Sequence, residues 1–514
     1  MRGMNRTWKW ALLLAVVASP WLAGLSFPFL YDDVGMIAEN AFLENPANLG
    51  KVLTGQTLAD PRVVNGRRPA VLATYFLDRA LFGLEPAGWR TTNLALHLGC
   101  AALLAGLARR LTGRGYFAAA TGVLFGLHPV LSEAVHAPGF RADVLCLFFV
   151  LAFLHAFLAA GPRAGIWRMG GVACLALALL AKEAAVVAPV LLGALMVLFP
   201  SAFRVSRRDQ IAGWAASAGL AALFFALWLA LPADLQAAGS SWNGESLRFP
   251  ETAYSAPALW TRTLRLLLVP WPLNVAPGFE PVSSAASIRF AAGVGWLALC
   301  AWGARRMRRA APAAALGLVW MLAFFGPVSN LWPLLHPVAD RYFYPIAPGF
   351  ALLAAWLLSR QSRAARGMGL GALAATYALL AVWRIGQWES AEKLWTAAYF
   401  QNPKSATAAT WLGLLREEAG DADGARTFYR AAVEANPQAV ATWANWGMLE
   451  GKAGNWSESE RLLRRAAEIR PESGKGWRDL SVCLAMQGRA EEAAQAAARA
   501  AELSPERSYG SAKP

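Results

Sequence analysis

Long runs of apolar residues, separated by short polar connections, dominate most of the chain. A helix that crosses the hydrocarbon core of a bilayer needs about 20 such residues, and about eleven segments meet that criterion. They lie near residues 10–30, 91–109, 116–134, 142–160, 168–182, 184–200, 211–231, 286–304, 311–329, 342–359 and 367–385. The pattern predicts an all-α protein built around a polytopic bundle of membrane-spanning helices.

Positive charge alternates between the two ends of these segments. Arg and Lys precede the first segment and follow the second, fourth, sixth, eighth and tenth. Because short basic loops stay on the cytoplasmic side, the N-terminus is expected in the cytoplasm and the first segment is expected to be a retained helix. The connections 31–90, 232–285 and 330–341 then face outward, together with the C-terminus.

A regular repeat occupies the C-terminal part of the chain. Prolines recur at intervals of 34 residues, at Pro403, Pro437, Pro471 and Pro505. Two further columns keep this register, formed by Leu412, Trp446 and Leu480 and by Gly420, Gly454 and Gly488. This is the period of tetratricopeptide repeats, which stack helix pairs into an α-solenoid. We expect a membrane domain at 1–388, a half-repeat plus three repeats at 389–506, and a flexible tail at 507–514.

Composition agrees with a membrane protein and removes other classes. The chain is 56% hydrophobic and 16% charged, with a mean hydropathy of +0.36, which is too apolar for an ordinary soluble enzyme. The net charge of +15 comes mostly from short clusters between apolar segments, so no nucleic-acid partner is expected. The five cysteines show neither the spacing of a zinc site nor a disulfide framework.

Two adjacent carboxylates, Asp32 and Asp33, open the first outward connection. Adjacent carboxylates repel, so one of them can have a raised pKa and act as a general base near neutral pH. The other is then free for a structural or metal contact. Alternatively, the pair caps a following surface helix, and the sequence leaves both interpretations open.

Further charged residues gather at the outward ends of the apolar segments, where an ionisable group is costly and is a candidate for function. They are Glu133, Arg141, Asp143, Lys182, Glu183, Asp340 and Arg341. Cations at such a depth need an anion, and a lipid phosphate is the obvious one. The alternative is internal pairing, of Arg141 with Asp143 or Glu133 and of Lys182 with Glu183.

These motifs, in this order, resemble the transmembrane and tetratricopeptide repeat-containing O-mannosyltransferase family and its bacterial relatives. The resemblance covers nearly the whole chain. It rests on the aspartate pair, His128-Pro129, Glu133-Ala134-Val135, Arg141-Ala142-Asp143, Ala181-Lys182-Glu183, Val269–Leu273 and Asp340-Arg341-Tyr342. It implies the fold of C-type glycosyltransferases (GT-C).

The resemblance also implies roles for individual residues. In such folds an acidic residue of the first outer loop activates the acceptor hydroxyl, a role that we assign to Asp33, with Asp32 as the second choice. The phosphate of a polyprenyl-phosphate sugar donor would be bound by Arg141, Lys182 and Arg341 with His128 nearby, supported by Glu133, Asp143 and Glu183. A single base, without a carboxylate nucleophile, predicts inversion at the sugar carbon.

We therefore expect transfer of a hexose, with mannose among the candidates, to Ser or Thr of exported proteins, which the repeats would recruit. A glycan or lipid acceptor stays open, as does a non-catalytic anchor whose repeats gather envelope proteins. A transporter is disfavoured because no internal duplication is detectable. An aspartate pair can bind Mg²⁺ or Mn²⁺, but no ligand set at a diagnostic spacing indicates a metal. Composition favours a bacterial inner membrane, with the repeats in the periplasm.

Overall fold

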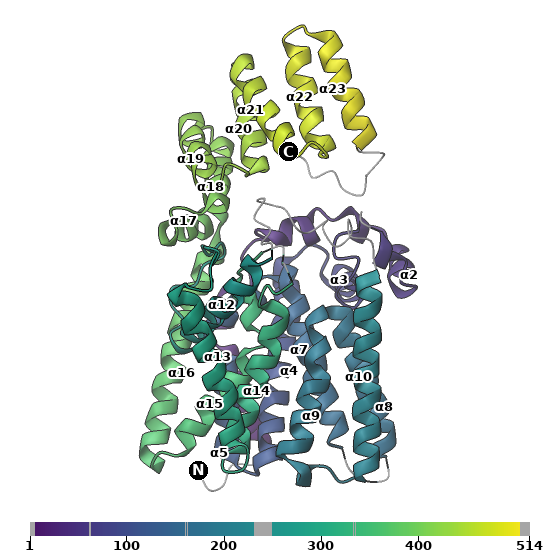
Figure 1. Ribbon diagram of the computed structural model, residues 1–514, viewed down its shortest axis with the longest axis vertical. Coiled ribbons are helices and arrows are strands. Elements are labelled where there is room, and N and C mark those ends of the chain that lie inside the picture. Colours follow the sequence, from purple (N-terminus) through teal and green to yellow (C-terminus); the bar gives the residue numbers. More distant parts are fainter. Residues whose placement is uncertain are drawn as a thin grey trace.

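The computed structural model describes residues 6–60, 63–159, 161, 163–230, 249–332, 334 and 336–503. Within these ranges, helices are the only regular secondary structure. Long helices run side by side in a bundle, and a stack of shorter helices continues beyond one end of it (Figure 1). The chain is thus all-α, with two parts in the predicted order.

Every apolar segment predicted from the sequence falls on a helix or on a pair of consecutive helices. The bundle helices are α1 (Arg6–Ala18), α4 (Pro86–Thr112), α5 (Gly115–Gly126), α6 (Ser132–His136), α7 (Arg141–Phe157), α8 (Ala164–Ala181), α9 (Ala188–Leu198), α10 (Arg207–Ala230), α13 (Ile288–Met307), α14 (Pro312–Val328), α15 (Ala347–Ser359) and α16 (Arg363–Gly386). This arrangement is that of a multi-pass membrane protein.

Fewer of these helices span a membrane by length and composition than the sequence predicts. Five do so among the described residues, and six if α5 and the following turn and helix, bent by 49°, count as one span, against about eleven expected. Several of the other predicted spans fall on apolar helices shorter than 18 residues. Thus α9, α14 and α15 contain 11, 17 and 13 residues.

Two of the predicted outward connections are themselves partly helical. The first contains α2 (Asn48–Leu53) and α3 (Pro69–Phe82), and the second contains α12 (Glu251–Leu268). These helices are missed by a search for apolar runs because their buried faces include polar residues, such as Asp78 of α3 and Thr263 of α12. Residues 231–248 of the second connection lie outside the described residues.

The predicted outward segments gather at one end of the bundle. Figure 1 shows α2, α3 and α12 at the end where the repeats begin, with the N-terminus at the opposite end. These three helices thus lie on the same side of the bundle as the repeats, as the outward assignment of their connections requires. Which end faces the cytoplasm stays a prediction.

The repeats form the predicted stack of helix pairs. The half-repeat is α17 (Ala391–Gln401), and the three pairs are α18 (Ala406–Glu418) with α19 (Ala422–Ala435), α20 (Val440–Lys452) with α21 (Trp456–Ile469), and α22 (Gly474–Met486) with α23 (Ala490–Leu503). Each pair turns at a glycine with φ of +77° or +78°, namely Gly420, Gly454 and Gly488. Only glycine adopts this left-handed conformation without a steric cost, which explains that column of the repeat. Pro505 and the predicted tail lie outside the described residues.

A single hydrophobic cluster joins the first repeat helices to the outer end of the bundle. We call it the junction core. It consists of Leu30, Ala137, Phe140, Val275, Trp388, Leu394, Trp395, Ala398, Ala408 and Leu412, with Tyr31 packed against it. The half-repeat is therefore buried against the same outer loops that carry the candidate site.

Candidate active site

A buried arginine fixes the chain just before the aspartate pair. The Nε atom of Arg90, on α4, donates to the carbonyl of His136 at 3.0 Å, and Nη2 donates to the carbonyl of Pro28 at 2.7 Å. The Nη1 atom donates to the carbonyls of Leu25 and Phe27. Arg90 thus binds residues 25–28 through their backbone carbonyls. Because any residue has such a carbonyl, the sequence of this segment does not reveal the contact.

Asp33 points into the protein and is fully buried. Its Oδ1 accepts a hydrogen bond from the backbone N–H of Gly139 at 2.6 Å, and its Oδ2 lies 4.0 Å from Nη2 of Arg90. Burial raises the pKa of Asp33 to about 7, although Arg90 and the Gly139 hydrogen bond oppose the shift. A Cβ on Gly139 would lie 2.9 Å from Oδ1, so glycine permits this close approach.

Asp32, by contrast, is partly exposed. Burial raises its pKa, and the nearby guanidinium of Arg341 lowers it. Asp33 occupies the position before the short helix Val34–Ala38, but its side chain accepts no capping hydrogen bond from that helix within the described chain. The capping interpretation is therefore wrong, and the two carboxylates have the divided environments that the sequence predicts.

Tyr31, which follows a non-helical stretch after the turn Trp21–Gly24, sets the direction of the aspartate pair. Its φ angle is +54°, in the left-handed region that bulky residues rarely adopt. Its ring packs against Trp395 of the half-repeat at 5.3 Å between centroids and against Phe140 at 5.9 Å. A backbone strained by about 1–3 kcal/mol persists only where the surroundings hold it, and here the junction core does so.

Arg341 faces the aspartate pair from the other side. It lies in the turn Asp340–Phe343, and its Nη1 contacts Oε1 of Glu133 at 2.6 Å. The other oxygen of Glu133 accepts from the backbone N–H of Arg341 at 3.1 Å. The guanidinium carbon lies 4.2 Å from the ring centroid of Phe140. Glu133 thus holds Arg341 in place, as the sequence expects of a supporting residue.

Two further cations lie around Tyr342. The Nζ atom of Lys182 contacts Oδ1 of Asp143 at 2.6 Å and lies 5.3 Å from the ring centroid of Tyr342. Arg68, which precedes α3, contacts Glu183 at 3.3 Å, and both of these side chains are partly exposed. We call Arg68, Lys182 and Arg341 the cation cluster.

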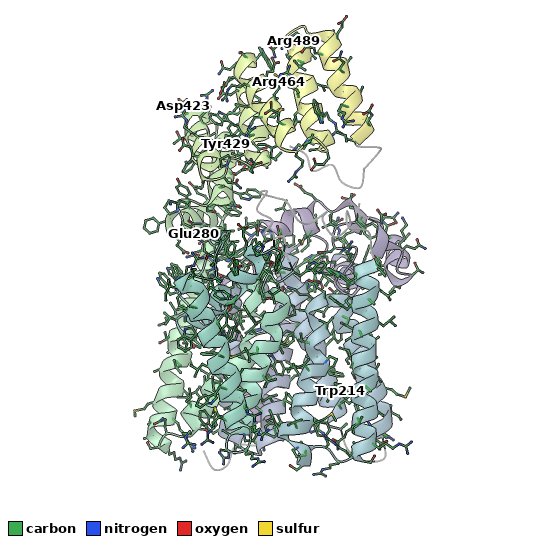
Figure 2. All side chains as sticks on the ribbon, in the orientation of Figure 1. Trp214, Glu280, Asp423, Tyr429, Arg464 and Arg489 are labelled. Atoms are coloured by element: carbon green, nitrogen blue, oxygen red, sulfur yellow. The ribbon has the colours of Figure 1, made fainter. Side chains whose placement is uncertain are left out.

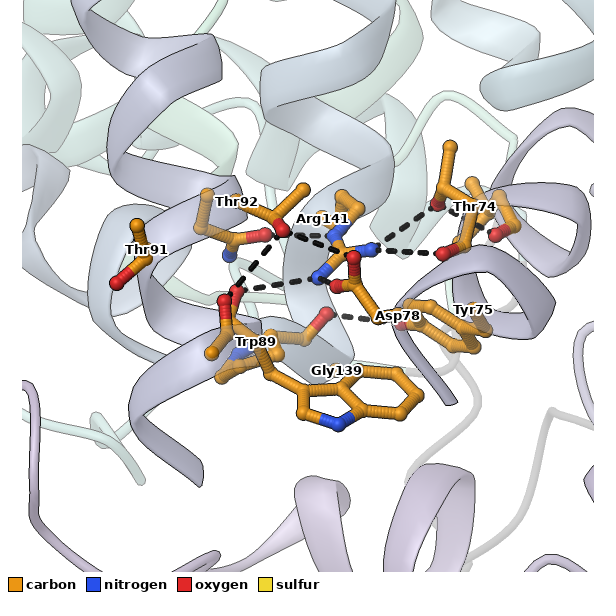
Figure 3. A network of polar contacts seen from close by, with 12 residues as sticks. Thr74, Tyr75, Asp78, Trp89, Thr91, Thr92, Gly139 and Arg141 are labelled. Atoms are coloured by element: carbon orange, nitrogen blue, oxygen red, sulfur yellow. Dashed lines mark hydrogen bonds and ion pairs between the residues drawn. The ribbon is translucent and has the colours of Figure 1, made fainter. Parts of the chain in front are cut away.

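Arg141 is held in a closed network of polar contacts (Figure 3). Its Nη2 contacts Asp78 at 2.5 Å and the carbonyl of Trp89, and its Nε donates to Asn93 at 2.7 Å. Its Nη1 donates to the carbonyl and hydroxyl of Thr74. A guanidinium has five N–H donors, and these five contacts use all of them. Arg141 therefore joins α3, α4 and α7 rather than presenting donors to a ligand.

His128 is also occupied within the bundle. Its Nδ1 accepts from the backbone N–H of Val130 at 3.3 Å, and its Nε2 lies 3.0 Å from the carbonyl of Leu267, at the end of α12. Both ring nitrogens are thereby used, and the side chain is buried. The structure thus separates the four residues assigned to the donor phosphate. Lys182 and Arg341 both lie near the ring of Tyr342, and Arg341 lies close to Asp32, whereas Arg141 and His128 fasten helices.

An open cleft of about 530 Å³ is lined by Tyr31, the residue before the aspartate pair, and by Arg341. One wall is formed by Tyr31 and Arg341, a second by residues 275–280 with Arg289, and a third by the turn between α17 and α18. The cleft was not foreseen from the sequence because its walls come from three distant segments. No group of three or more His, Cys, Asp or Glu side chains suited to a metal occurs in the described part of the chain.

The chain is similar in sequence to a repeat family and to several known proteins. A tetratricopeptide repeat family model matches residues 378–440 and 445–508. Over 294 residues the chain is 30% identical to Protein O-mannosyl-transferase Tmtc1 of Drosophila melanogaster, covering 51% of this chain and 33% of that protein. Over 449 residues it is 26% identical to Protein O-mannosyl-transferase TMTC4 of Mus musculus, covering 74% and 60%. The chain is a relative of these protein O-mannosyltransferases.

Solved structures resemble the chain more distantly. ArnT from Cupriavidus metallidurans in the apo state is 17% identical, with a TM-score of 0.45, and the match covers 98% of this chain and 89% of that one. MamA is 22% identical, with a TM-score of 0.21, and the match covers 30% and 87%. Likenesses at this level do not bear on function.

In this O-mannosyltransferase relative, the internal ion pairs predicted as an alternative do form, but with other partners. Arg141 pairs with Asp78, Lys182 with Asp143, Glu133 with Arg341 and Glu183 with Arg68. The predicted partners, Asp143 or Glu133 for Arg141 and Glu183 for Lys182, are wrong. Residues one or two positions apart project in different directions, so each side chain finds its partner on another element.

The sequence reasoning missed Arg68, Asp78 and Arg90. Asp78 lies on the buried face of α3. An acidic residue among the apolar residues of that face is the one feature of the sequence that could have indicated a buried ion pair. Arg68 directly precedes the proline that begins α3, and its approach to Glu183 depends on how the first outer loop folds back. No local pattern indicates that approach.

Proposed function

We propose that this protein transfers a hexose from a polyprenyl-phosphate donor to Ser or Thr of exported proteins, at the end of the bundle where the repeats lie. The observation that carries the proposal is that a partly exposed carboxylate, Asp32, lies at this end close to Arg341 of the cation cluster. The names of the relatives, protein O-mannosyl-transferases, favour mannose as the sugar. Composition favours a bacterial inner membrane, and the predicted orientation then places the site on the periplasmic side.

Asp32 is the better candidate for the general base, which reverses the order of choice made from the sequence. Its side chain is partly exposed, whereas Asp33 is fully buried and bonded to Gly139. In the proposed step Asp32 takes the proton of the acceptor hydroxyl as that oxygen attacks the anomeric carbon. The bond between this carbon and the phosphate oxygen breaks, polyprenyl phosphate leaves, and the configuration inverts.

The cation cluster would stabilise the charge that develops on the departing phosphate. Lys182 has three donors and uses one on Asp143. The side chain of Arg341 bonds Glu133 through Nη1, and its other nitrogens make no hydrogen bond within the described chain. Donors aimed at developing charge in a dry site contribute more to catalysis than they would in water. Glu133, Asp143 and Glu183 hold these cations before the donor binds.

Asp33 and Arg141 would act on the site through other residues. Asp33 fixes the backbone of the pair against Gly139, and Arg141 holds α3 against α4 and α7. We assign both to positioning, so their substitution should weaken transfer through disorder of the site.

Transfer by purified protein in lipid tests the proposal. Radiolabelled polyprenyl-phosphate hexoses, mannose first, are supplied with a pool of exported proteins, and wild type is compared with Asp32→Asn. Loss of a general base should reduce transfer by about a hundredfold or more. Glu44→Gln, which neutralises an exposed carboxylate of the same loop, should leave the rate unchanged.

Other outcomes would redirect the assignment. Loss of transfer in Asp33→Asn with retention in Asp32→Asn would move the base to Asp33. Absence of transfer with every donor, while the full-length protein still captures an exported protein, would replace the transferase with the scaffold.

A further inference from the structure

The cleft beside Arg341 is shared by the membrane domain and the first repeat. Tyr31 and Arg341 form its inner wall, and Asn402 and Lys404, in the turn between α17 and α18, form its outer wall. Glu280 lies on the loop between them, and Figure 2 shows it between the bundle and the repeats. A molecule in this cleft would contact the repeat array and the candidate site together.

The two walls are tied to each other by specific contacts. The side chain of Asn274 donates to the carbonyl of Ala398 in α17 at 3.0 Å, and its backbone N–H donates to Asp340, next to Arg341, at 2.8 Å. A Cβ on Gly278 would lie 2.8 Å from the side-chain nitrogen of Asn402, so the loop closely approaches the repeat. These contacts and the junction core fix the distance between the repeat and the site.

The cleft carries an excess of positive charge, and one cation is unpaired. Arg289 contacts Glu280 at 3.3 Å and Arg341 contacts Glu133. Burial lowers the pKa of His336 to about 3, so this residue is neutral at physiological pH. Lys404 is exposed and makes no ion pair among the described residues. It is therefore free to meet an anionic group that enters the cleft.

The position of Lys404 in the repeat register strengthens this interpretation. The same position in the next two units, 34 residues apart, is occupied by Gln438 and Glu472. The lysine thus occurs in the unit that borders the cleft and is replaced by a neutral and then by an acidic residue farther along the array. The repeat framework accepts all three residues, so its own packing does not require the lysine.

Resting on the proposed transferase function, we infer that this cleft admits an extended polypeptide acceptor and that Lys404 favours acidic side chains beside the acceptor Ser or Thr. The cleft lies between loops of the membrane domain and the turn that begins the first repeat. The apolar chain of the donor stays among the bundle helices and the lipid. The volume of the cleft lies within the range of about 300–1,000 Å³ that is usual for ligand sites. A site of this size suits a short extended segment of polypeptide.

Peptide kinetics with the full-length protein in lipid test the inference. Two synthetic peptides share one Ser/Thr site and differ only in flanking residues, acidic in one and basic in the other. Wild type should prefer the acidic peptide, mainly through a lower KM. Lys404→Glu removes one attraction and adds one repulsion, each worth up to about fivefold at an exposed site. It should reduce that preference roughly tenfold or more while leaving KM for the donor unchanged.

Gln438→Glu is the matched control because it places the same charge at the equivalent position of the next unit. It should behave as wild type. Equal kcat/KM for the two peptides with wild type would overturn the inference, as would an equal effect of Gln438→Glu.

Direct binding of the two peptides, labelled with a fluorophore, separates this inference from the proposed function. Binding of the acidic peptide that Lys404→Glu weakens, without transfer to any acceptor, would retain the cleft as a peptide site and overturn the transferase. Transfer to exported proteins, together with peptide binding that Lys404→Glu leaves unchanged, would retain the transferase and overturn the role of Lys404.

Discussion

Replacement of Trp395 by alanine should impair catalysis from within the repeat region. The ring of Trp395 is 1% exposed, stacks on Trp411 at 5.2 Å and meets the ring of Tyr31 edge-on at 5.3 Å. Tyr31 directly precedes the aspartate pair and holds a left-handed backbone conformation. Loss of the tryptophan therefore removes one of the two aromatic supports of that conformation.

The magnitude follows from two comparable energies. An aromatic pair contributes about 0.5–1.5 kcal/mol beyond its buried area, and the left-handed conformation of Tyr31 costs about 1–3 kcal/mol. Without the ring, Tyr31 should relax toward an unstrained conformation and carry Asp32 with it. A displacement of about 1 Å at a reacting group can cost about a hundredfold in rate. We expect kcat/KM to fall by about ten- to a hundredfold.

The assay must separate this effect from loss of repeat stability, because a buried Trp→Ala change costs about 3–5 kcal/mol. Trp446→Ala is the matched control, since Trp446 is also buried but packs within the next unit of the array. Trp395→Phe should restore much of the rate by keeping a ring near Tyr31. Equal kinetics and equal pH profiles for Trp395→Ala and Trp446→Ala would refute the reasoning.

Three other substitutions test the site. Gly139→Ala places a methyl group 2.9 Å from Oδ1 of Asp33 and should lower kcat with little change in melting temperature; unchanged kcat would contradict the close approach. Transfer should decline as the pH falls through the pKa of Asp32, because the base must be ionised and burial raises that pKa above its ordinary value. Arg341→Gln removes a cation that lowers this pKa, so the acidic limb of the rate profile should move to higher pH; a shift to lower pH would exclude Asp32 as the titrating group. Asp78→Ala strands a buried guanidinium and should destabilise the protein by about 3–5 kcal/mol, seen as a lower melting temperature in detergent.

The elements that the sequence predicted correctly are those with a periodic signal. The apolar segments and the 34-residue columns report local structure, because each depends on neighbours within one helix or one repeat. Helix α12 escaped prediction because polar residues such as Thr252, Ser255 and Thr263 interrupt its apolar residues, so it forms no continuous apolar run.

The contacts within the site depend instead on residues far apart in the chain. Arg341 and Glu133 are separated by 208 positions, and Arg141 and Asp78 by 63. The sequence identified the aspartate pair and predicted that its members differ. It could not show which one is exposed, because the main-chain contacts of Arg90 and the packing of Tyr31 decide that.

Mass spectrometry of exported proteins tests the central claim most directly. Cells that lack the protein would produce either wild type or Asp32→Asn at matched levels, and peptides from their exported proteins would be searched for added hexose. The account predicts hexose on Ser or Thr residues with wild type and its loss with Asp32→Asn. The same hexose pattern with both proteins, or no hexose with either, would contradict it.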